Sequence, residues 1–319
     1  MGKESIHEAT ALSTDAARDM PITACWIAVD WGTSNMRAWA MGADDTVLAR
    51  GESARGMGQL DPSEFEPVLL EIIQSWIDPE RVTPIIACGM VGARQGWIEA
   101  AYARTPTPPV AAKPTRAPAT DRRIAVFILP GVSQSAPPDV MRGEETQIAG
   151  YVATNGGSGI LCLPGTHSKW VEIADGRIAR FRTAMTGEIF SLLAEKSVLR
   201  HSVGTKDWSE DGFGSGVREA LGDREIVTKL FSIRAGGLLE GTSAQDSRSR
   251  LSGLLIGAEL AGVSQYWRGN DVALIGTSEL SRLYQTALNI AGVSTRLLDA
   301  EEMTLAGLCA ARSALENVQ

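Results

Sequence analysis

The order of apolar and polar residues near the start of the chain predicts a β-hairpin. An apolar run at 26–29 ends at Asp30, and a second apolar run begins at Met36. Four small or polar residues form the turn between the two strands: Gly32, Thr33, Ser34 and Asn35. Glycine lets a ligand approach the backbone closely, and the N–H groups and hydroxyls of such a turn form a nest for phosphate oxygens. The hairpin is therefore interpreted as a site for nucleotide phosphates, although ordinary hairpins carry the same short pattern.

The same order of elements begins the second half of the chain. An apolar run at 159–163 leads into a small-residue turn, and further strands are expected at 170–174 and 178–183. The residues of this second turn that we expect to contact phosphate are Gly165, Thr166, His167, Ser168 and Lys169. The glycine-rich run 155–159, at the start of this apolar strand, is the best candidate for a domain boundary.

Strands and helices alternate along both halves. Helices are predicted at 62–76, 144–154, 187–199, 223–239, 249–267, 279–290 and 301–315. Further strands are predicted at 46–53, 84–88, 124–130, 271–275 and 294–298. The segment 105–123 is rich in proline and has no period, so it is predicted to be a loop. The result is an α/β protein with two domains, 23–155 and 156–319, preceded by a disordered extension at 1–22.

Composition excludes several classes of function. The chain has 319 residues and a net charge of −8, and this acidity disfavours a nucleic-acid partner because phosphate backbones require a basic face. No apolar run approaches the roughly 18 residues of a membrane helix, so no membrane partner is expected. Four cysteines lie far apart without a paired Cys/His motif: Cys25, Cys88, Cys162 and Cys309. They are expected to be reduced, buried thiols of a cytoplasmic protein, without structural zinc.

Six segments, taken together, resemble one family of sugar-acid kinases. They read DWGTSNMRAW at 30–39, GMVGARQGWIE at 89–99, MRGEETQ at 141–147, LPGTHSKW at 163–170, MTGEIF at 185–190 and SGLLIGAE at 252–259. The chain thereby resembles the 2-dehydro-3-deoxygalactonokinase (2-keto-3-deoxygalactonate kinase) family, within the acetate and sugar kinase, Hsp70 and actin superfamily. This resemblance implies an actin-like ATPase (ribonuclease H-like) fold with duplicated sheets and a nucleotide cleft between them. It also implies ATP and Mg²⁺ as cofactors, and phosphorylation of the terminal hydroxyl of 2-dehydro-3-deoxy-D-galactonate in galactonate breakdown.

Charged residues near the two turns are assigned to catalysis. Asp30 lies at the mouth of the first turn, where a carboxylate suits a hydrated Mg²⁺, so it is assigned to the metal and to catalysis. Arg37 and Lys169 are expected to supply positive charge to the phosphates. Glu144 and Glu145 begin a predicted helix, and one of them is expected to accept the proton of the substrate hydroxyl. Glu144 is preferred for its spacing to the second turn, but the related glycerol kinase type has an Asp here, so the choice stays open.

The loop at 89–102 is expected to bind the sugar acid. Its residues assigned to the substrate are Arg94, Gln95, Trp97 and Glu99. Arg94 offers a planar fork for a carboxylate, and Trp97 offers an apolar wall for the deoxy carbon. Gly276 follows a predicted strand and begins the segment at which this superfamily usually holds adenosine.

Two other functions stay open from sequence alone. One is a kinase of the same superfamily with another substrate, such as the epimer 2-dehydro-3-deoxygluconate. The other is an actin- or Hsp70-like ATPase that binds a protein partner, although the chain is short for a chaperone and has no peptide-binding module. The sequence also leaves open the nucleotide preference and whether the chain forms a homo-oligomer.

Overall fold

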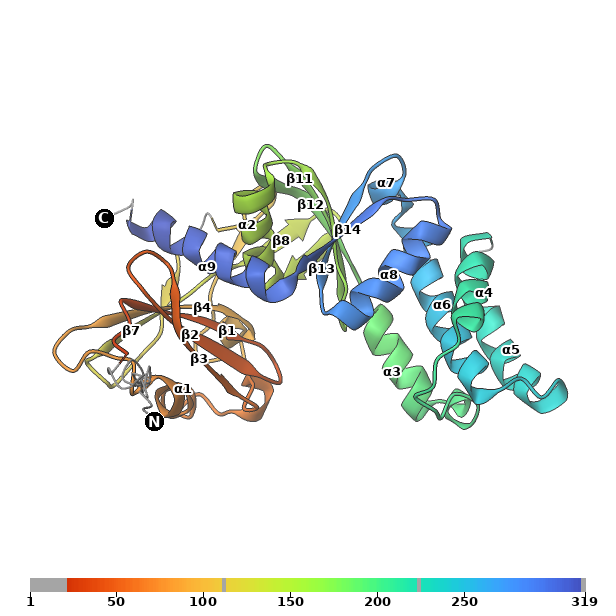
Figure 1. Cartoon of the computed structure of the whole chain (residues 1–319), viewed down its shortest axis with the longest axis horizontal. Helices are drawn as coiled ribbons and strands as arrows, with labels where there is room; N and C mark the ends of the chain where they lie inside the picture. Colours follow the sequence, from red (N-terminus) through yellow and green to blue (C-terminus); the bar gives the residue numbers. More distant parts are fainter. Residues whose placement is uncertain (1–21, 111–112, 223–224, 317–319) are drawn as a thin grey trace, which may run out of the picture.

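Two sheets built on one plan form the frame of the molecule (Figure 1). The computed structural model describes residues 22–110, 113–222 and 225–316, so the extension predicted at 1–22 lies, except for residue 22, outside the described residues. The first sheet consists, in spatial order, of β3 (Val47–Ser53), β2 (Met36–Met41), β1 (Trp26–Trp31), β4 (Thr83–Gly89), β7 (Ile124–Ile128) and β6 (Thr115–Arg116). The second consists of β12 (Arg177–Ala184), β11 (Ser168–Ala174), β10 (Gly159–Leu163), β13 (Val272–Gly276) and β14 (Thr295–Asp299).

The strand pairing is the same in both sheets. The first three strands of each half are antiparallel neighbours, and parallel strands follow on the free side of the first strand: β4 and β7 beyond β1, and β13 and β14 beyond β10. Of these later strands in the described residues, only β6, at the far edge of the first sheet, is antiparallel to its neighbour β7. The register pairs Asp30 with Arg37 in the first sheet and Leu163 with Lys169 in the second. The duplicated mixed sheets predicted from the sequence are thereby confirmed.

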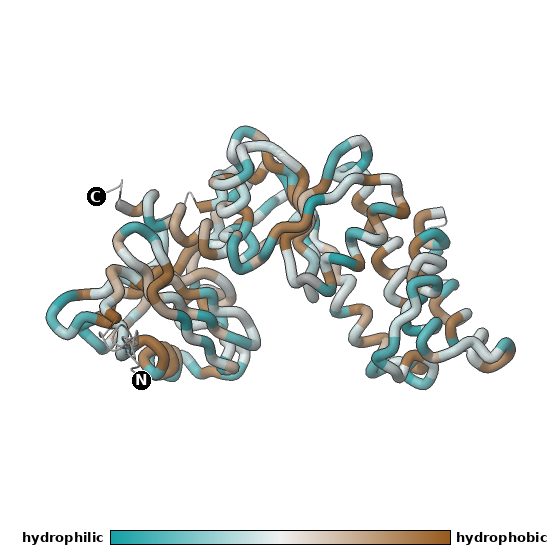
Figure 2. Tube along the Cα trace, in the orientation of Figure 1, coloured by the Kyte–Doolittle hydropathy of each residue, from teal (hydrophilic) through white to brown (hydrophobic). Residues whose placement is uncertain are grey.

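Helices cover both faces of the first sheet. Alternate residues of a strand point to opposite faces, so Ile27 packs with Phe65 of α1 (Phe65–Ile73), whereas Ala28 packs with Leu308 of α9 (Ala300–Glu316). Figure 2 shows the apolar residues concentrated in α1 and in the strands that it covers, and polar residues at the loops. The C-terminal helix therefore completes the core of the N-terminal sheet.

The second sheet is covered in a corresponding way. On one face, Leu161 packs with Ile148 of α2 (Glu144–Asn155) and with a small sheet of β5 (Tyr102–Arg104), β8 (Gly131–Ser135) and β9 (Pro138–Met141). On the other face, Cys162 packs with residues of α6 (Ala244–Gly262), α7 (Ser264–Trp267) and α8 (Ser278–Ile290). Helix α2 thus precedes the predicted boundary but packs on the second sheet, while α9 packs on the first. The boundary at 155/156 stays a proposal, and the two halves interlock through these helices.

A group of helices between β12 and β13 extends the second half away from the first sheet (Figure 1). It contains α3 (Thr186–Lys196), η3 (Val198–His201), α4 (Glu210–Gly222), α5 (Ile226–Leu239) and α6. The sequence analysis missed α4, because its glycines lower helix propensity. Packing explains them: a Cβ on Gly216 would lie 2.4 Å from the Arg250 carbonyl oxygen, and one on Gly253 would lie 2.1 Å from that of Phe213. The glycines therefore permit the close contact of α4 with α6.

Other differences from the sequence-based expectations are small. Short strands β5, β8 and β9 were not predicted, and β6 lies within the segment predicted to be a loop. Cys88 and Cys162 are buried, but Cys25 is exposed and Cys309 is partly exposed, so the expectation of four buried thiols was wrong. Cys25 precedes β1 rather than lying in it, which explains its exposure. None of the helices in the described part of the chain is both long and apolar enough to cross a membrane.

Two short 3-10 helices of the first half, η1 (Met57–Gln59) and η2 (Met90–Gly92), lie beside the predicted sites.

Candidate active site

Backbone hydrogen bonds from the segment 56–58 hold the first predicted phosphate turn in place. The carbonyls of Gly32, Thr33 and Ser34 accept bonds of 2.9, 2.9 and 3.1 Å from N–H groups of residues 56–58, at the start of η1. The Gly32 N–H donates to the Asn35 carbonyl at 2.9 Å and closes the turn. Thr33, Ser34 and Asn35 are exposed, so their polar side chains stay open to a ligand.

Three segments meet at Gly89, the last residue of β4. A Cβ at this position would lie 2.7 Å from the Trp31 carbonyl oxygen and 3.4 Å from Asp30 Oδ1. A Cβ on Gly143 would lie 3.3 Å from the Gly89 Cα. Both glycines also have positive φ angles, 91° and 105°, which L side chains rarely adopt. The absence of side chains here brings Asp30 close to the start of α2, which carries the predicted catalytic base.

Asp30 is held by an arginine network on its side of the sheet. Its Oδ2 lies 2.6 Å from Arg37 Nη2, and Arg37 Nη1 lies 3.6 Å from Glu301 at the start of α9. Glu301 also binds Arg50 at 2.5 Å. The Arg37 guanidinium is therefore shared between two carboxylates. To contact phosphate as predicted, it must break these ion pairs or bind the phosphate in addition to them.

The second predicted phosphate turn lies against the start of α3. The Thr166 carbonyl accepts from the Glu188 N–H at 3.0 Å, and His167 Nε2 lies 2.5 Å from Glu188 Oε2. Thr166 and His167 are exposed, whereas Ser168 is fully buried with its hydroxyl 2.6 Å from the Tyr284 hydroxyl. The backbone of the turn and its first residues are thus open, but the Ser168 side chain is committed to the interior.

Glu144 joins the first half of the chain to the second turn. Its Oε1 lies 2.7 Å from Lys169 Nζ, and its Oε2 accepts from the Arg142 N–H at 3.1 Å. Lys169 is only 5% exposed and also donates to the His167 carbonyl at 3.0 Å. The Glu144 side chain is 25% exposed, so solvent reaches it. The structure therefore brings together the preferred catalytic base and the second phosphate turn.

Glu145 lies in different surroundings from its neighbour. It is 1% exposed, and both carboxylate oxygens accept from the Gly143 N–H, at 2.9 and 2.8 Å. Burial, with a further contribution from the charge of Glu144, raises the pKa of Glu145 to about 8. It is consequently mainly protonated at neutral pH and poorly suited to accept a proton.

The predicted substrate loop is anchored by its tryptophan. Trp97 is 7% exposed; its ring is stacked on Phe65 at 6.0 Å between centroids and meets Trp31 edge-on at 6.3 Å. This burial corrects the interpretation of Trp97 as an open wall of the substrate site, because its ring belongs to the core of the first sheet. Three other residues assigned to the substrate are exposed: Arg94, Gln95 and Glu99. Their contact with the sugar acid stays a prediction.

Arg142, which the sequence analysis quoted only as part of a motif, supports this loop from below. Its Nη2 donates to the Ala100 carbonyl at 2.6 Å, and its guanidinium lies 4.3 Å from the centre of the Tyr102 ring. Arg142 is 8% exposed and lies two residues before Glu144 in the chain. The loop and the predicted base are thereby connected through one buried side chain.

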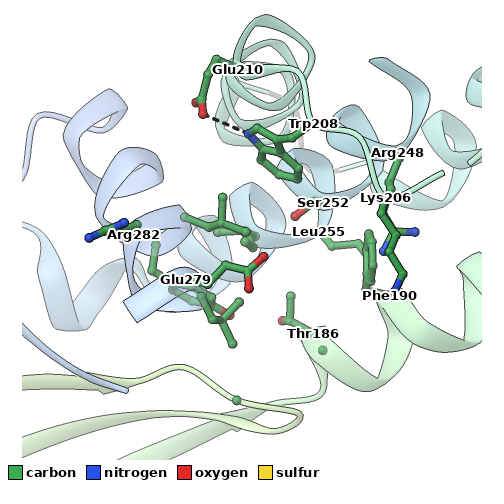
Figure 3. A pocket seen from close by; sticks show the side chains of 16 residues that line it. Thr186, Phe190, Lys206, Trp208, Glu210, Arg248, Ser252, Leu255, Glu279 and Arg282 are labelled. Carbon is green, nitrogen blue, oxygen red and sulfur yellow. Dashed lines mark hydrogen bonds between the residues drawn. The ribbon is translucent and has the colours of Figure 1, made fainter. Parts of the chain in front are cut away.

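A cavity of about 700 Å³ begins at the second turn and extends between α3, α6 and α8 (Figure 3). Gly165, Thr186 and Gly187 line its end at the turn. Trp208 and Phe190 supply aromatic surface, and Figure 3 shows charged side chains such as Glu279 and Arg248 around the same space. Gly276 lies behind the turn, where its Cβ would be 3.5 Å from Pro164 Cδ. Apart from Gly165, no lining residue was assigned to a site from the sequence, although part of the lining lies in the quoted segments 185–190 and 252–259.

The duplicated sheets, each with a small-residue turn between its first two strands, define an actin-like ATPase fold. The activator of 2-hydroxyisocaproyl-CoA dehydratase from Clostridium difficile with bound ADPNP shares this fold, with a TM-score of 0.50 at 12% identity over 92% of this chain and 96% of that chain. A crystal structure from Sinorhizobium meliloti, of a protein assigned as a 2-dehydro-3-deoxygalactonokinase, matches with a TM-score of 0.85 at 44% identity over 91% and 99% of the two chains.

Sequence comparison narrows the class to one family. A family model for 2-keto-3-deoxy-galactonokinase matches residues 30–311. The chain is 45% identical over 300 residues to a "Probable 2-dehydro-3-deoxygalactonokinase" of Rhizobium meliloti (strain 1021), covering 91% of this chain and 97% of that relative. It is 33% identical over 299 residues to the 2-dehydro-3-deoxygalactonokinase of Escherichia coli (strain K12), covering 93% and 100%. The chain belongs to the 2-keto-3-deoxy-galactonokinase family.

Proposed function

We propose that this protein transfers the terminal phosphoryl group of ATP to the 6-hydroxyl of 2-dehydro-3-deoxy-D-galactonate. The products are 2-dehydro-3-deoxy-6-phosphogalactonate and ADP. The observation that carries the proposal is the 2.7 Å contact between Glu144 Oε1 and Lys169 Nζ. This contact supports the proposal, because a partly exposed carboxylate lies directly beside the predicted phosphate turn in a chain whose relatives bear the name of this kinase.

The residues present fit a nucleotide with Mg²⁺. The cavity beside Gly165 has room for a nucleoside, and the exposed polar turn at 32–35 lies in the other half, next to Asp30. No cluster of three or more His, Cys, Asp or Glu side chains suited to a metal occurs among the described residues. Mg²⁺ does not require such a cluster, because it is usually bound through one or two carboxylates, water and the substrate phosphates. Asp30 would hold the ion, which when bound offsets the negative charge of the phosphates.

Glu144 is proposed to accept the proton of the 6-hydroxyl. Phosphoryl transfer depends mainly on positioning and charge stabilisation, so a base need only orient the hydroxyl and take its proton. Lys169 keeps the Glu144 carboxylate in place and adds positive charge next to the second turn. Arg94, exposed on the loop that Trp97 and Arg142 anchor, is proposed to bind the carboxylate of the sugar acid.

A coupled assay of ADP formation tests this function. The purified protein is supplied with Mg-ATP alone, with 2-dehydro-3-deoxy-D-galactonate, and with its gluconate epimer as the matched control, and ³¹P NMR locates the new phosphate. Turnover that depends on the galactonate, with phosphate on C6, supports the proposal. Turnover with other sugars only, or a slow ATPase activity indifferent to sugars, would contradict it. With four free thiols and ATP as cosubstrate, we propose a cytoplasmic location.

A further inference from the structure

A buried carboxylate lies behind the second phosphate turn, and the mechanism above gives it no role. Glu259 of α6 is 7% exposed and accepts hydrogen bonds from three side chains. Trp170 Nε1 donates to its Oε1 at 2.7 Å, the Tyr284 hydroxyl donates to its Oε2 at 2.7 Å, and the Thr186 hydroxyl donates to the same Oε2. The three donors are neutral and come from β11, α8 and α3, so one carboxylate connects four elements of the second half.

These contacts lead directly to the turn. The Tyr284 hydroxyl gives its proton to Glu259, so the Ser168 hydroxyl, 2.6 Å away, must donate to Tyr284. Ser168 follows His167 and is the first residue of β11. The chain Glu259–Tyr284–Ser168 therefore fixes the end of the turn from the interior.

The third donor fixes the opposite side of the same turn. Thr186 is the first residue of α3, and the next residue, Gly187, packs so closely that a Cβ would lie 2.6 Å from the Gly165 carbonyl oxygen. Thr186, Gly187, Gly165 and Tyr284 all line the cavity. The hydrogen bonds from α3 and α8 to Glu259 therefore come from residues that line the part of the cavity next to the phosphate turn.

We propose that Glu259 is a positioning residue for nucleotide binding, which holds the second phosphate turn and the start of α3 in the arrangement that accepts the phosphates of ATP. The proposal rests on the proposed function in that it takes the cavity to be the nucleotide site. Hydrogen bonds to a carboxylate are stronger than those between neutral groups, so three of them can order a short turn. Burial raises the pKa of Glu259, and the hydrogen bonds from Thr186, Trp170 and Tyr284 oppose that rise.

Substitutions at Glu259 and Tyr284, with a control at Trp267, separate positioning from general stability. Glu259→Ala removes all three hydrogen bonds. Glu259→Gln keeps the size of the side chain and can bond to the same three groups, since hydroxyls both donate and accept. Trp267→Phe is the matched control, because it removes another buried hydrogen bond of the same core, from Trp267 Nε1 to the Leu260 carbonyl at 2.8 Å. Tyr284→Phe removes the hydroxyl that bonds both Glu259 and Ser168, leaves the bonds from Trp170 and Thr186 to Glu259 intact, and replaces Glu259→Ala if that variant does not fold.

Affinity for a non-hydrolysable ATP analogue is measured by calorimetry on the full chain, with thermal unfolding alongside. Glu259→Ala or Tyr284→Phe should weaken binding about tenfold or more, the equivalent of losing one bond to a charged group, while Glu259→Gln stays closer to the wild type. Trp267→Phe should lower the melting temperature without weakening binding. In the kinase assay, the KM for ATP should rise and that for the sugar acid should not.

Unchanged analogue binding in Glu259→Ala or Tyr284→Phe overturns the inference, and so does an equal loss in Trp267→Phe. Failure of the proposed function gives a different result: the wild type then binds the analogue but does not phosphorylate the sugar acid, and the variants still weaken that binding. A wild-type protein that binds no adenine nucleotide overturns the inference outright.

Discussion

Glu144 and Glu145 are adjacent in the chain, but only one of them is suited to proton transfer. Glu144 is partly exposed beside Lys169, whereas Glu145 is buried against the Gly143 N–H. We expect Glu144→Gln to lower kcat by about 10²–10⁴, the usual loss for a general base, with little change in the KM for ATP. Glu145→Gln serves as the matched control and should cost much less. The opposite order of the two kcat values would transfer the role to Glu145.

Glu145 should instead make stability depend on pH. Its folded pKa is about 8, against an ordinary value of 4.5 in the unfolded chain, so between these values the folded protein keeps a proton that the unfolded chain has lost. Stability due to this group is therefore full below pH 4.5, falls as the pH rises and is lost above pH 8. The pH-dependent contribution of Glu145 to the free energy of unfolding is on the order of a few kcal/mol.

Urea unfolding at pH 5.5 and 8.5 measures this dependence. Glu145→Gln cannot ionise, so its free energy of unfolding should fall less between the two pH values than that of the wild type. Glu240→Gln, a substitution of an exposed glutamate, should keep the wild-type difference. Equal pH dependence in Glu145→Gln and the wild type would show that this carboxyl titrates normally.

Arg94 is predicted to determine affinity for the sugar acid. Its guanidinium lies exposed on an anchored loop, where a bidentate pair with a carboxylate can form without displacing other contacts. Arg94→Ala should raise the KM for the sugar acid about 10- to 100-fold, the loss expected for bonds to a charged group, and leave the KM for ATP unchanged. Arg122→Ala, which removes an exposed arginine elsewhere in the first half, should change neither constant. A rise in the KM for ATP alone would assign Arg94 to the phosphates.

Single residues were predictable from sequence where a local pattern carries the chemistry. The acid at the end of a strand and the small residues after it predict the hairpin with Asp30 beside the turn at 32–35 without any tertiary information, and its contact with phosphate stays a prediction. Trp97 shows the opposite case, since the same side chain suits a substrate wall or a core, and only its contacts with Phe65 and Trp31 decide. Glu259 was similarly hidden, because its three donors come from distant segments.

At the scale of elements, the two hairpins were predictable from the order of apolar residues and from the residues of their turns. The segments that hold these turns in place were not. The first turn rests on residues 56–58, more than twenty positions further along the chain. No spacing rule connects the two segments, so the sequence analysis assigned no role to Gly56. Helix α4 was missed for a related reason, because its glycines serve contact with α6 and contradict local helix propensity.

Gly56 is therefore expected to matter for the first turn. A Cβ there would lie 2.3 Å from both the Ser34 carbonyl carbon and the Thr33 carbonyl oxygen, although its own backbone angles suit any residue. Gly56→Ala should displace the turn, raise the KM for ATP about tenfold and cost about 1–3 kcal/mol of stability, as overpacking usually does. Gly262→Ala is the control, because no heavy atom lies within 4 Å of its added Cβ. Wild-type ATP kinetics in Gly56→Ala would mean that the turn does not hold phosphate.

At the scale of the whole molecule, each half contributes a helix that packs on the sheet of the other half. Helix α2 leaves the first half to pack on the second sheet, and α9 returns from the second half to pack on the first. The two helices cross in close contact: a Cβ on Gly150 would lie 2.0 Å from the Met303 carbonyl oxygen, and one on Gly307 would lie 1.8 Å from that of Thr146. Duplication of the sheets was visible in the sequence. The exchange was not, because an apolar helix face does not specify which sheet it covers.

This crossing should set the position of the proposed catalytic base, Glu144. Thr146 lies two residues after Glu144, so Gly307→Ala must move α9 or the first turn of α2. Alanine favours a helix by about 1 kcal/mol over glycine, so any loss of stability reports the packing alone. We expect a lower melting temperature and a kcat about 10- to 100-fold lower, since a displacement near 1 Å is enough to misalign a base. The KM for ATP should change little, and Gly262→Ala should behave as the wild type. A normal kcat in folded Gly307→Ala would show that Glu144 is positioned by Lys169 and the second turn, independently of how the two halves are joined.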